Sequence, residues 1–184
     1  MASIWEVIAG GDADELVSAL RSNPALANEC SPRGMTPLVL ATQANNFCAM
    51  EIILNCGGSP TMSTSIRSAV SGRLDSGVVP IMFASTKEAI RLLVGAGADV
   101  NVTDENGRSV FLRVNALFDS SLAEELIAAG AVPTPEQVKW LAGQASEELK
   151  FRESKAQGPL ERIAQLRDFI GWTEKWLTSS SSGL

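Results

Sequence analysis

The chain has 184 residues, a formal net charge of −6, and 45% hydrophobic and 20% charged residues. This composition is typical of a folded globular protein and lacks the basic excess that binding to nucleic acid or to an anionic membrane requires. The chain contains no histidine, which excludes histidine-based nucleophilic dyads and removes the commonest metal ligand.

Three cysteines, Cys30, Cys48 and Cys56, form no CxxC pair. We expect free thiols in a reducing compartment. The N-terminus lacks the positive region and the apolar run of a secretory signal. No stretch approaches the roughly 20 apolar residues of a membrane span. These features favour a cytoplasmic protein without a membrane segment.

Apolar residues at helical spacing alternate with glycine stops along residues 1–134 and predict four pairs of short helices. The expected pairs and the insert between them are 1–30, 31–62, an insert at 63–73, 74–103 and 104–134. In the second pair, Thr36 can cap a helix and Pro37 can occupy its first turn. The third pair has only 17 residues from Pro80 to its stop at Gly97, against 20 from Pro37 to Gly57, which predicts that its first helix or its inter-helix turn is shortened.

Two runs of residues make the repeat recognisable: Gly34-Met35-Thr36-Pro37-Leu38-Val39-Leu40-Ala41 and Gly97-Ala98-Asp99-Val100-Asn101. They resemble the ankyrin repeat, whose unit is a β-turn finger followed by two antiparallel helices. The resemblance covers residues 4–134 and implies an all-α fold, an ankyrin-repeat solenoid of helix-turn-helix units with short β-turn fingers. Val39 stands where the family has a histidine, so the hydrogen bonds of that histidine are expected to be absent or replaced.

The insert departs from this pattern, because Ile66, Val70 and Leu74 have the i, i+4, i+8 spacing of a short helix. Insertions in repeat proteins lie in loops, often on the binding face. Two interpretations stay open. The segment around 63–76 is either a solvated loop whose apolar residues cover the edge of the stack, or a finger that contacts a partner.

A second departure is Arg113, which falls on a core-facing position of its predicted helix. A buried guanidinium needs an acidic or carbonyl partner. Either its stem packs while its head reaches water, or the last repeat is distorted at this point. The third possibility is a buried ion pair with a carboxylate of the C-terminal helices.

Residues 135–178 lack the repeat pattern and predict a helical hairpin. Thr134, Pro135 and Gln137 form a capping-box start, and Phe169, Trp172 and Trp176 flank the final helix. Because the open end of a solenoid must be covered, this hairpin is expected to be a C-terminal helical cap. A protruding helix that binds a partner or dimerises is the alternative. Residues 179–184 are expected to be a disordered tail.

The sequence shows no phosphate-binding loop, no metal-ligand cluster and no nucleophile beside a base, so we expect neither catalysis nor a cofactor. The resemblance instead implies a non-catalytic protein–protein interaction module, such as an adaptor, assembly factor or inhibitor. It would bind another protein in a concave groove formed by finger tips and first helices, and would be monomeric alone. By register, the implied partner-binding residues are Arg33, Met35, Gln43, Ser76, Val78, Thr103, Glu105, Asn106, Arg108 and Leu117, with Pro32, Ala44 and Ala116 beside them.

A second hypothesis is a small-ligand or nucleotide sensor. It would use a pocket between the insert and the C-terminal hairpin, with Arg67, Arg73 and Arg113 as the basic candidates.

Overall fold

The computed structural model describes residues 3–67, 74–155 and 159–181, and these are mainly α-helical. They also contain a two-stranded antiparallel sheet, so the fold is mainly α rather than purely α. The elements are α1 (Ile4–Gly10), α2 (Ala13–Ser22), the 3-10 helix η1 (Pro24–Asn28), α3 (Pro37–Gln43), α4 (Phe47–Asn55), β1 (Thr64–Arg67), β2 (Leu74–Val78), the 3-10 helix η2 (Pro80–Phe83), α5 (Lys87–Gly95), α6 (Val110–Val114), the 3-10 helix η3 (Asn115–Leu117), α7 (Ser120–Ala128), α8 (Pro135–Lys155) and α9 (Leu160–Ser181).

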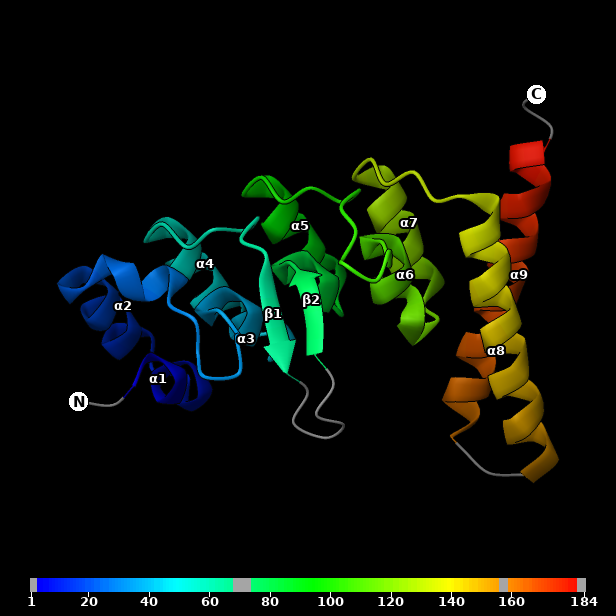
Figure 1. The fold of residues 1–184 in the computed structure, drawn as a ribbon. Helices are drawn as coiled ribbons and strands as arrows, with labels where there is room; N and C mark the ends of the chain where they lie inside the picture. Colours follow the sequence, from blue (N-terminus) through cyan, green and yellow to red (C-terminus); the bar gives the residue numbers. More distant parts are fainter. Residues whose placement is uncertain (1–2, 68–73, 156–158, 182–184) are drawn as a thin grey trace.

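The helices follow one another along an elongated molecule, from α1 at one end to α8 and α9 at the other (Figure 1). Short helices pack in two rows. One row consists of α1, α3, η2 and α6, each in contact with the next. The other row consists of α2, α4, α5 and α7. The apolar faces of the two rows meet in the core, where Leu38, Ile53 and Phe111 are almost completely buried.

The helix starts follow from their capping residues. Thr36 accepts a hydrogen bond from the backbone N–H of Val39 (3.2 Å), and Ser109 accepts one from Leu112 (3.2 Å). At the corresponding position of η2, Val79 provides no side-chain cap. The element that follows is a 3-10 helix of four residues, as the short spacing before Gly97 predicts.

Strands β1 and β2 form an antiparallel hairpin, with Thr64 opposite Val78 and Ile66 opposite Asp75. The predicted helix over Ile66, Val70 and Leu74 is therefore wrong for its first and last residues, while Val70 lies outside the described residues. The burial of β1 alternates with the period of two of a strand, with Thr64 and Ile66 inward.

Backbone hydrogen bonds join this hairpin to the turns on both sides. The N–H of Arg67 donates to the carbonyl of Arg33 (3.0 Å), in the turn before α3. The N–H of Glu105, in the turn before α6, donates to the carbonyl of Ser76 (3.0 Å). Strands β1 and β2 therefore continue a line of turns along one edge of the helical rows.

Helices α8 and α9 lie side by side at the C-terminal end (Figure 1). The aromatic side of α9 faces the preceding helices rather than solvent. The ring of Phe169 lies 5.7 Å from that of Phe118, and the ring of Trp172 lies 6.5 Å from that of Phe111. This packing covers the aromatic side of α9 and buries Phe169 completely. Helix α9 continues through Ser181, so the predicted disorder of residues 179–181 is wrong; residues 182–184 lie outside the described part.

Candidate binding cleft

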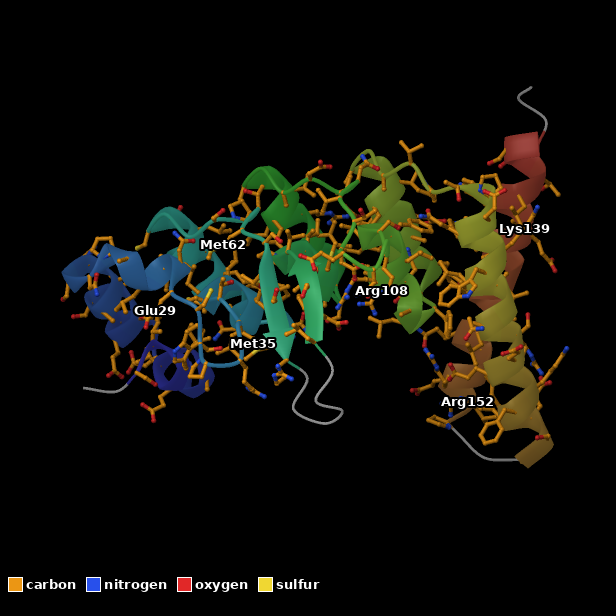
Figure 2. The ribbon with its side chains drawn as sticks, in the orientation of Figure 1. Glu29, Met35, Met62, Arg108, Lys139 and Arg152 are labelled. Atoms are coloured by element: carbon orange, nitrogen blue, oxygen red, sulfur yellow. The ribbon has the colours of Figure 1, made fainter. Side chains whose placement is uncertain are left out.

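An open cleft of about 710 Å³ lies between the turn before α6, helix α6 and the first turns of α8. Figure 2 shows Arg108 near α6 and Lys139 near the start of α8. The residues that line the cleft are Met82, Asn106, Gly107, Arg108, Leu112, Arg113, Ala116, Glu136, Gln137 and Trp140.

The walls of the cleft are largely apolar. Leu112 and Ala116 lie four residues apart and so share one side; Leu112 is half-buried and Ala116 is exposed. Met82, from η2, is buried. The α8 wall carries Trp140, which is 55% exposed. An indole left this accessible beside other apolar groups is typical of a surface that a partner covers.

Arg108 and Arg113 line the polar side of the cleft. Together with two carboxylates beside them, they form a group that we call the charge cluster: Asp75, Asp104, Arg108 and Arg113. Arg108 donates through Nε to Asp104 (2.8 Å) and through Nη2 to Asp75 (2.6 Å). Arg113 donates through Nη1 to Asp104 (2.8 Å), and its Nη2 lies 3.5 Å from Asp75. The cluster ties β2, the turn before α6 and α6 itself together.

Asp104 lies at the centre of the charge cluster, with its side chain fully buried. Its Oδ1 accepts the backbone N–H groups of Asn106 and Arg108, both at 2.9 Å. Burial raises the pKa of this carboxyl, but the backbone hydrogen bond from Arg108 and the guanidinium groups of Arg113 and Arg108 outweigh it. The pKa of Asp104 therefore lies below its usual value, and the carboxylate stays ionised.

Arg113 has carboxylate partners, but they differ from those of the ion-pair alternative. Its side chain is 12% exposed, and its carboxylate partners come from the turn before α6 and from β2 rather than from the C-terminal helices. Its guanidinium carbon also lies 5.4 Å from the centre of the Phe83 ring. The expected core-facing position is thus occupied by a charge that neighbouring groups neutralise.

The α8 wall is fixed by a reciprocal cap. The N–H of Thr134 donates to Oε1 of Gln137 (3.1 Å), and the N–H of Gln137 donates to the Thr134 hydroxyl (3.3 Å). Gln137 also donates through Nε2 to the hydroxyl of Ser109, at the start of α6 (3.2 Å). These bonds hold the two walls of the cleft at a set spacing.

The structure brings only some of the predicted partner-binding residues together. Asn106, Arg108 and Ala116 line the cleft. Thr103 and Glu105 are exposed on the same turn, and Leu117 is 43% exposed just after α6.

Other predicted residues lie elsewhere. Pro32, Arg33 and Met35 line a second hollow of about 450 Å³ near α1 and α3. Gln43 and Ala44 are exposed at the end of α3, and Ser76 is half-buried.

Two of the predicted residues are not available to a partner in the way that the sequence implied. Met35 is 8% exposed and Val78 is completely buried. The reason is the hairpin: β1 lies against Arg33 and Gly34, and Val78 ends β2 on its inward side. Of the basic candidates for a ligand pocket, Arg113 lines the cleft and Arg67 does not; Arg73 lies outside the described residues.

Sequence reasoning missed Met82, Leu112, Glu136 and Trp140. A signal for Trp140 was present, because Val138, Leu141 and Ala145 share one helical side and are completely buried. Trp140 lies off that side. Its exposure follows from the same periodicity that buries its neighbours.

Within the described residues, no three cysteine, aspartate or glutamate side chains converge as metal ligands, and no helix is both long and apolar enough to cross a bilayer. The three cysteines are free thiols. No family model matches the chain, and no curated protein shows significant sequence similarity to it.

Proposed function

We propose that this chain is a non-catalytic protein-binding module of the ankyrin-repeat type, which binds a segment of a partner protein in the cleft between α6 and α8. The observation that carries the proposal is the half-exposed indole of Trp140 in an open cleft with Leu112 and Ala116. Such a module would act as an adaptor, assembly factor or inhibitor.

The arrangement of the elements supports the repeat interpretation. Capped helices recur in two rows, and turns linked by backbone hydrogen bonds run along one edge. Repeats of this kind bury their apolar faces only against neighbours and need a covered end. The α8 and α9 pair would serve as that cover and, at the same time, form one wall of the binding site.

The chemistry of the cleft supports a protein partner. Exposed tryptophan, with arginine and methionine nearby, is the composition enriched at the centres of protein interfaces. The guanidinium groups are already held by Asp75 and Asp104, so little side-chain entropy remains to be lost on binding. The cleft would therefore act as a preformed site.

Affinity capture followed by mass spectrometry tests the proposal. Trp140→Ala removes the indole, and Ala116→Glu places a charge in the cleft. Both should abolish capture of any specific partner while leaving the far-UV circular dichroism and the free energy of unfolding unchanged. Leu160→Ala and Ala164→Glu are the matched controls, because both positions are exposed on α9 away from the cleft. A partner captured equally by all four variants would disprove the cleft as the binding site.

The second hollow needs its own variant, because a long partner segment could reach it. Arg33→Glu tests this, since Arg33 is exposed and lines that hollow. Loss of capture in Arg33→Glu together with loss in Trp140→Ala would extend the site along the row of turns. Loss in Trp140→Ala alone would confine it to the cleft.

A small-ligand sensor remains the second candidate, because the cleft volume of about 710 Å³ falls within the range of ligand pockets. A thermal-shift screen against nucleotides and metabolites tests it. Stabilisation that disappears in Ala116→Glu would favour this function over protein binding.

A further inference from the structure

The α8 wall of the cleft presents an aromatic face and a carboxylate side by side. Glu136 and Trp140 lie four residues apart on the helix, so they share one side, and both line the cleft. Trp140 is 55% exposed and Glu136 is exposed. Within the part of the chain that the structure describes, no cation pairs with Glu136 or lies over the Trp140 ring.

The opposite wall does not supply a free positive charge. Asp104 accepts from both Arg108 and Arg113, and Asp75 lies 2.6 Å from Arg108 and 3.5 Å from Arg113. An anion arriving from a partner would have to displace these carboxylates from charge-assisted hydrogen bonds. Arg108 and Arg113 are therefore already paired with carboxylates of the charge cluster, and Glu136 is the carboxylate that lines the cleft itself.

Glu136 remains ionised in this position. Hydrogen bonds from its own backbone N–H and then from the Thr134 hydroxyl hold the pKa of this carboxyl below its usual value, and the charge of Lys139 adds to the effect. Lys139 does not line the cleft. A negative charge next to an exposed indole face is thus a fixed feature of the wall near neutral pH.

We propose that the cleft recognises a lysine or arginine side chain of the partner segment, whose cationic head lies between the Trp140 ring and the Glu136 carboxylate. This inference rests on the proposed function and names the chemistry of its partner. The alkyl stem would pack on Leu112 and Ala116, as long basic side chains do on apolar surfaces. Arginine should bind at least as well as lysine, because a planar guanidinium stacks on an indole while it donates to a carboxylate.

A set of matched peptides tests the proposal directly. The peptides have the sequence acetyl-Gly-Leu-X-Leu-Gly-amide, with X as arginine, lysine, citrulline, norleucine or glutamate. Citrulline keeps the shape of arginine without its charge, and norleucine keeps only the apolar stem. Binding to the full chain is followed by the backbone amide shifts of Gly107 and Gln137 in two-dimensional NMR, since both residues line the cleft.

The arginine and lysine peptides should bind about tenfold more tightly than the citrulline and norleucine peptides, as expected for a cation–π contact combined with a carboxylate. Added salt should weaken only the two cationic peptides. Equal binding of all peptides, tighter binding of the glutamate peptide, or no saturation by any cationic peptide at about 10 mM would overturn the proposal.

Two variants assign the effect to the named groups. Glu136→Gln should weaken the arginine peptide about fivefold and leave the norleucine peptide unchanged. Glu161→Gln is its control, because Glu161 is also exposed in the first turn of a helix but lies outside the cleft. Trp140→Leu keeps an apolar side chain without a ring face, and should remove most of the preference for arginine over norleucine.

The same variants separate this inference from the proposed function. If Trp140→Ala abolishes capture of a partner while Glu136→Gln does not, the cleft binds protein without recognising a cation, and only the further inference fails. If neither variant affects capture, the cleft is not the partner site and both fail.

Discussion

The guanidinium of Arg113 and the carboxylate of Asp104 form an ion pair at 2.8 Å, with side chains that are 12% and 0% exposed. The pair joins α6 to the turn that precedes it. Asp104 also accepts two backbone N–H groups of that turn, so this contact ties the guanidinium of α6 to the backbone that forms one side of the cleft.

Removing Arg113 should therefore lower the free energy of unfolding more than removing a comparable surface arginine. Arg113→Met leaves the buried Asp104 carboxylate with one guanidinium, and we expect a loss of about 3 kcal/mol in the free energy of unfolding. Urea denaturation measures it. Arg91→Met is the control, because Arg91 pairs with Glu125 at 2.7 Å but is 62% exposed, and exposed pairs contribute little to the free energy of unfolding. Equal effects of the two changes would contradict the buried role of Arg113.

The depressed pKa of Asp104 predicts a specific pH dependence. A carboxyl whose folded pKa is lowered stabilises the protein above its unfolded pKa, about 3.9, and loses this contribution as the pH falls toward the folded value. The difference in unfolding free energy between the wild type and Asp104→Asn should thus be large at neutral pH and shrink below about pH 4. Urea titrations of both proteins across this range measure it. A difference that stays constant with pH would show that the turn hydrogen bonds, not the charge, account for the effect.

Gly34 tests how closely the hairpin approaches the turn before α3. Its φ is +82°, and a Cβ there would lie 1.8 Å from the carbonyl oxygen of Ser65. Gly34→Ala should destabilise the fold by about 3 kcal/mol, through left-handed strain and the displacement of β1.

Gly143→Ala is the matched control for this change. Nothing lies within 4 Å of a Cβ at position 143, and replacing a helical glycine there should stabilise the protein by about 0.5–1 kcal/mol. Similar destabilisation by both substitutions would contradict the close approach of β1.

The aromatic contacts of α9 predict the energetic role of the C-terminal helices. Phe169 is completely buried, with its ring 5.7 Å from those of both Phe118 and Trp172. Phe169→Ala should lower the free energy of unfolding by about 3–5 kcal/mol. Trp140→Ala, on the exposed side of α8, should change it by no more than about 0.5 kcal/mol. Chemical denaturation distinguishes them, and a small effect at Phe169 would contradict the role of α9 as a cover for the core.

The helices could be predicted from the sequence because their signals are local. A cap such as Thr36 or Ser109 acts within three residues, and apolar periodicity within a few turns. The hairpin could not be predicted, because strand pairing depends on residues distant in the chain. In addition, the spacing of Ile66 and Leu74 is the spacing expected of a helix.

The site was predicted only in part for the same reason. The position of Arg108 in its turn could be read from register, but the contact of Arg113 with Asp75 spans 38 residues. The prediction that Met35 and Val78 are exposed was wrong, because the hairpin lies over that edge. The sequence did not indicate the path of the hairpin. Trp140 was not among the predicted binding residues, because its place in the cleft depends on how α8 lies beside α6.

The backbone bonds from Arg67 to Arg33 and from Glu105 to Ser76 have a consequence for how the molecule opens. In a linear array whose units contact only their neighbours, the terminal units can unfold first, and unfolding can then proceed toward the middle. Here the hairpin forms a second connection between the turn before α3 and the turn before α6, so the elements between them should exchange their amide hydrogens as one cooperative block. Helices α1 and α2 lie outside the connected segment and should exchange sooner.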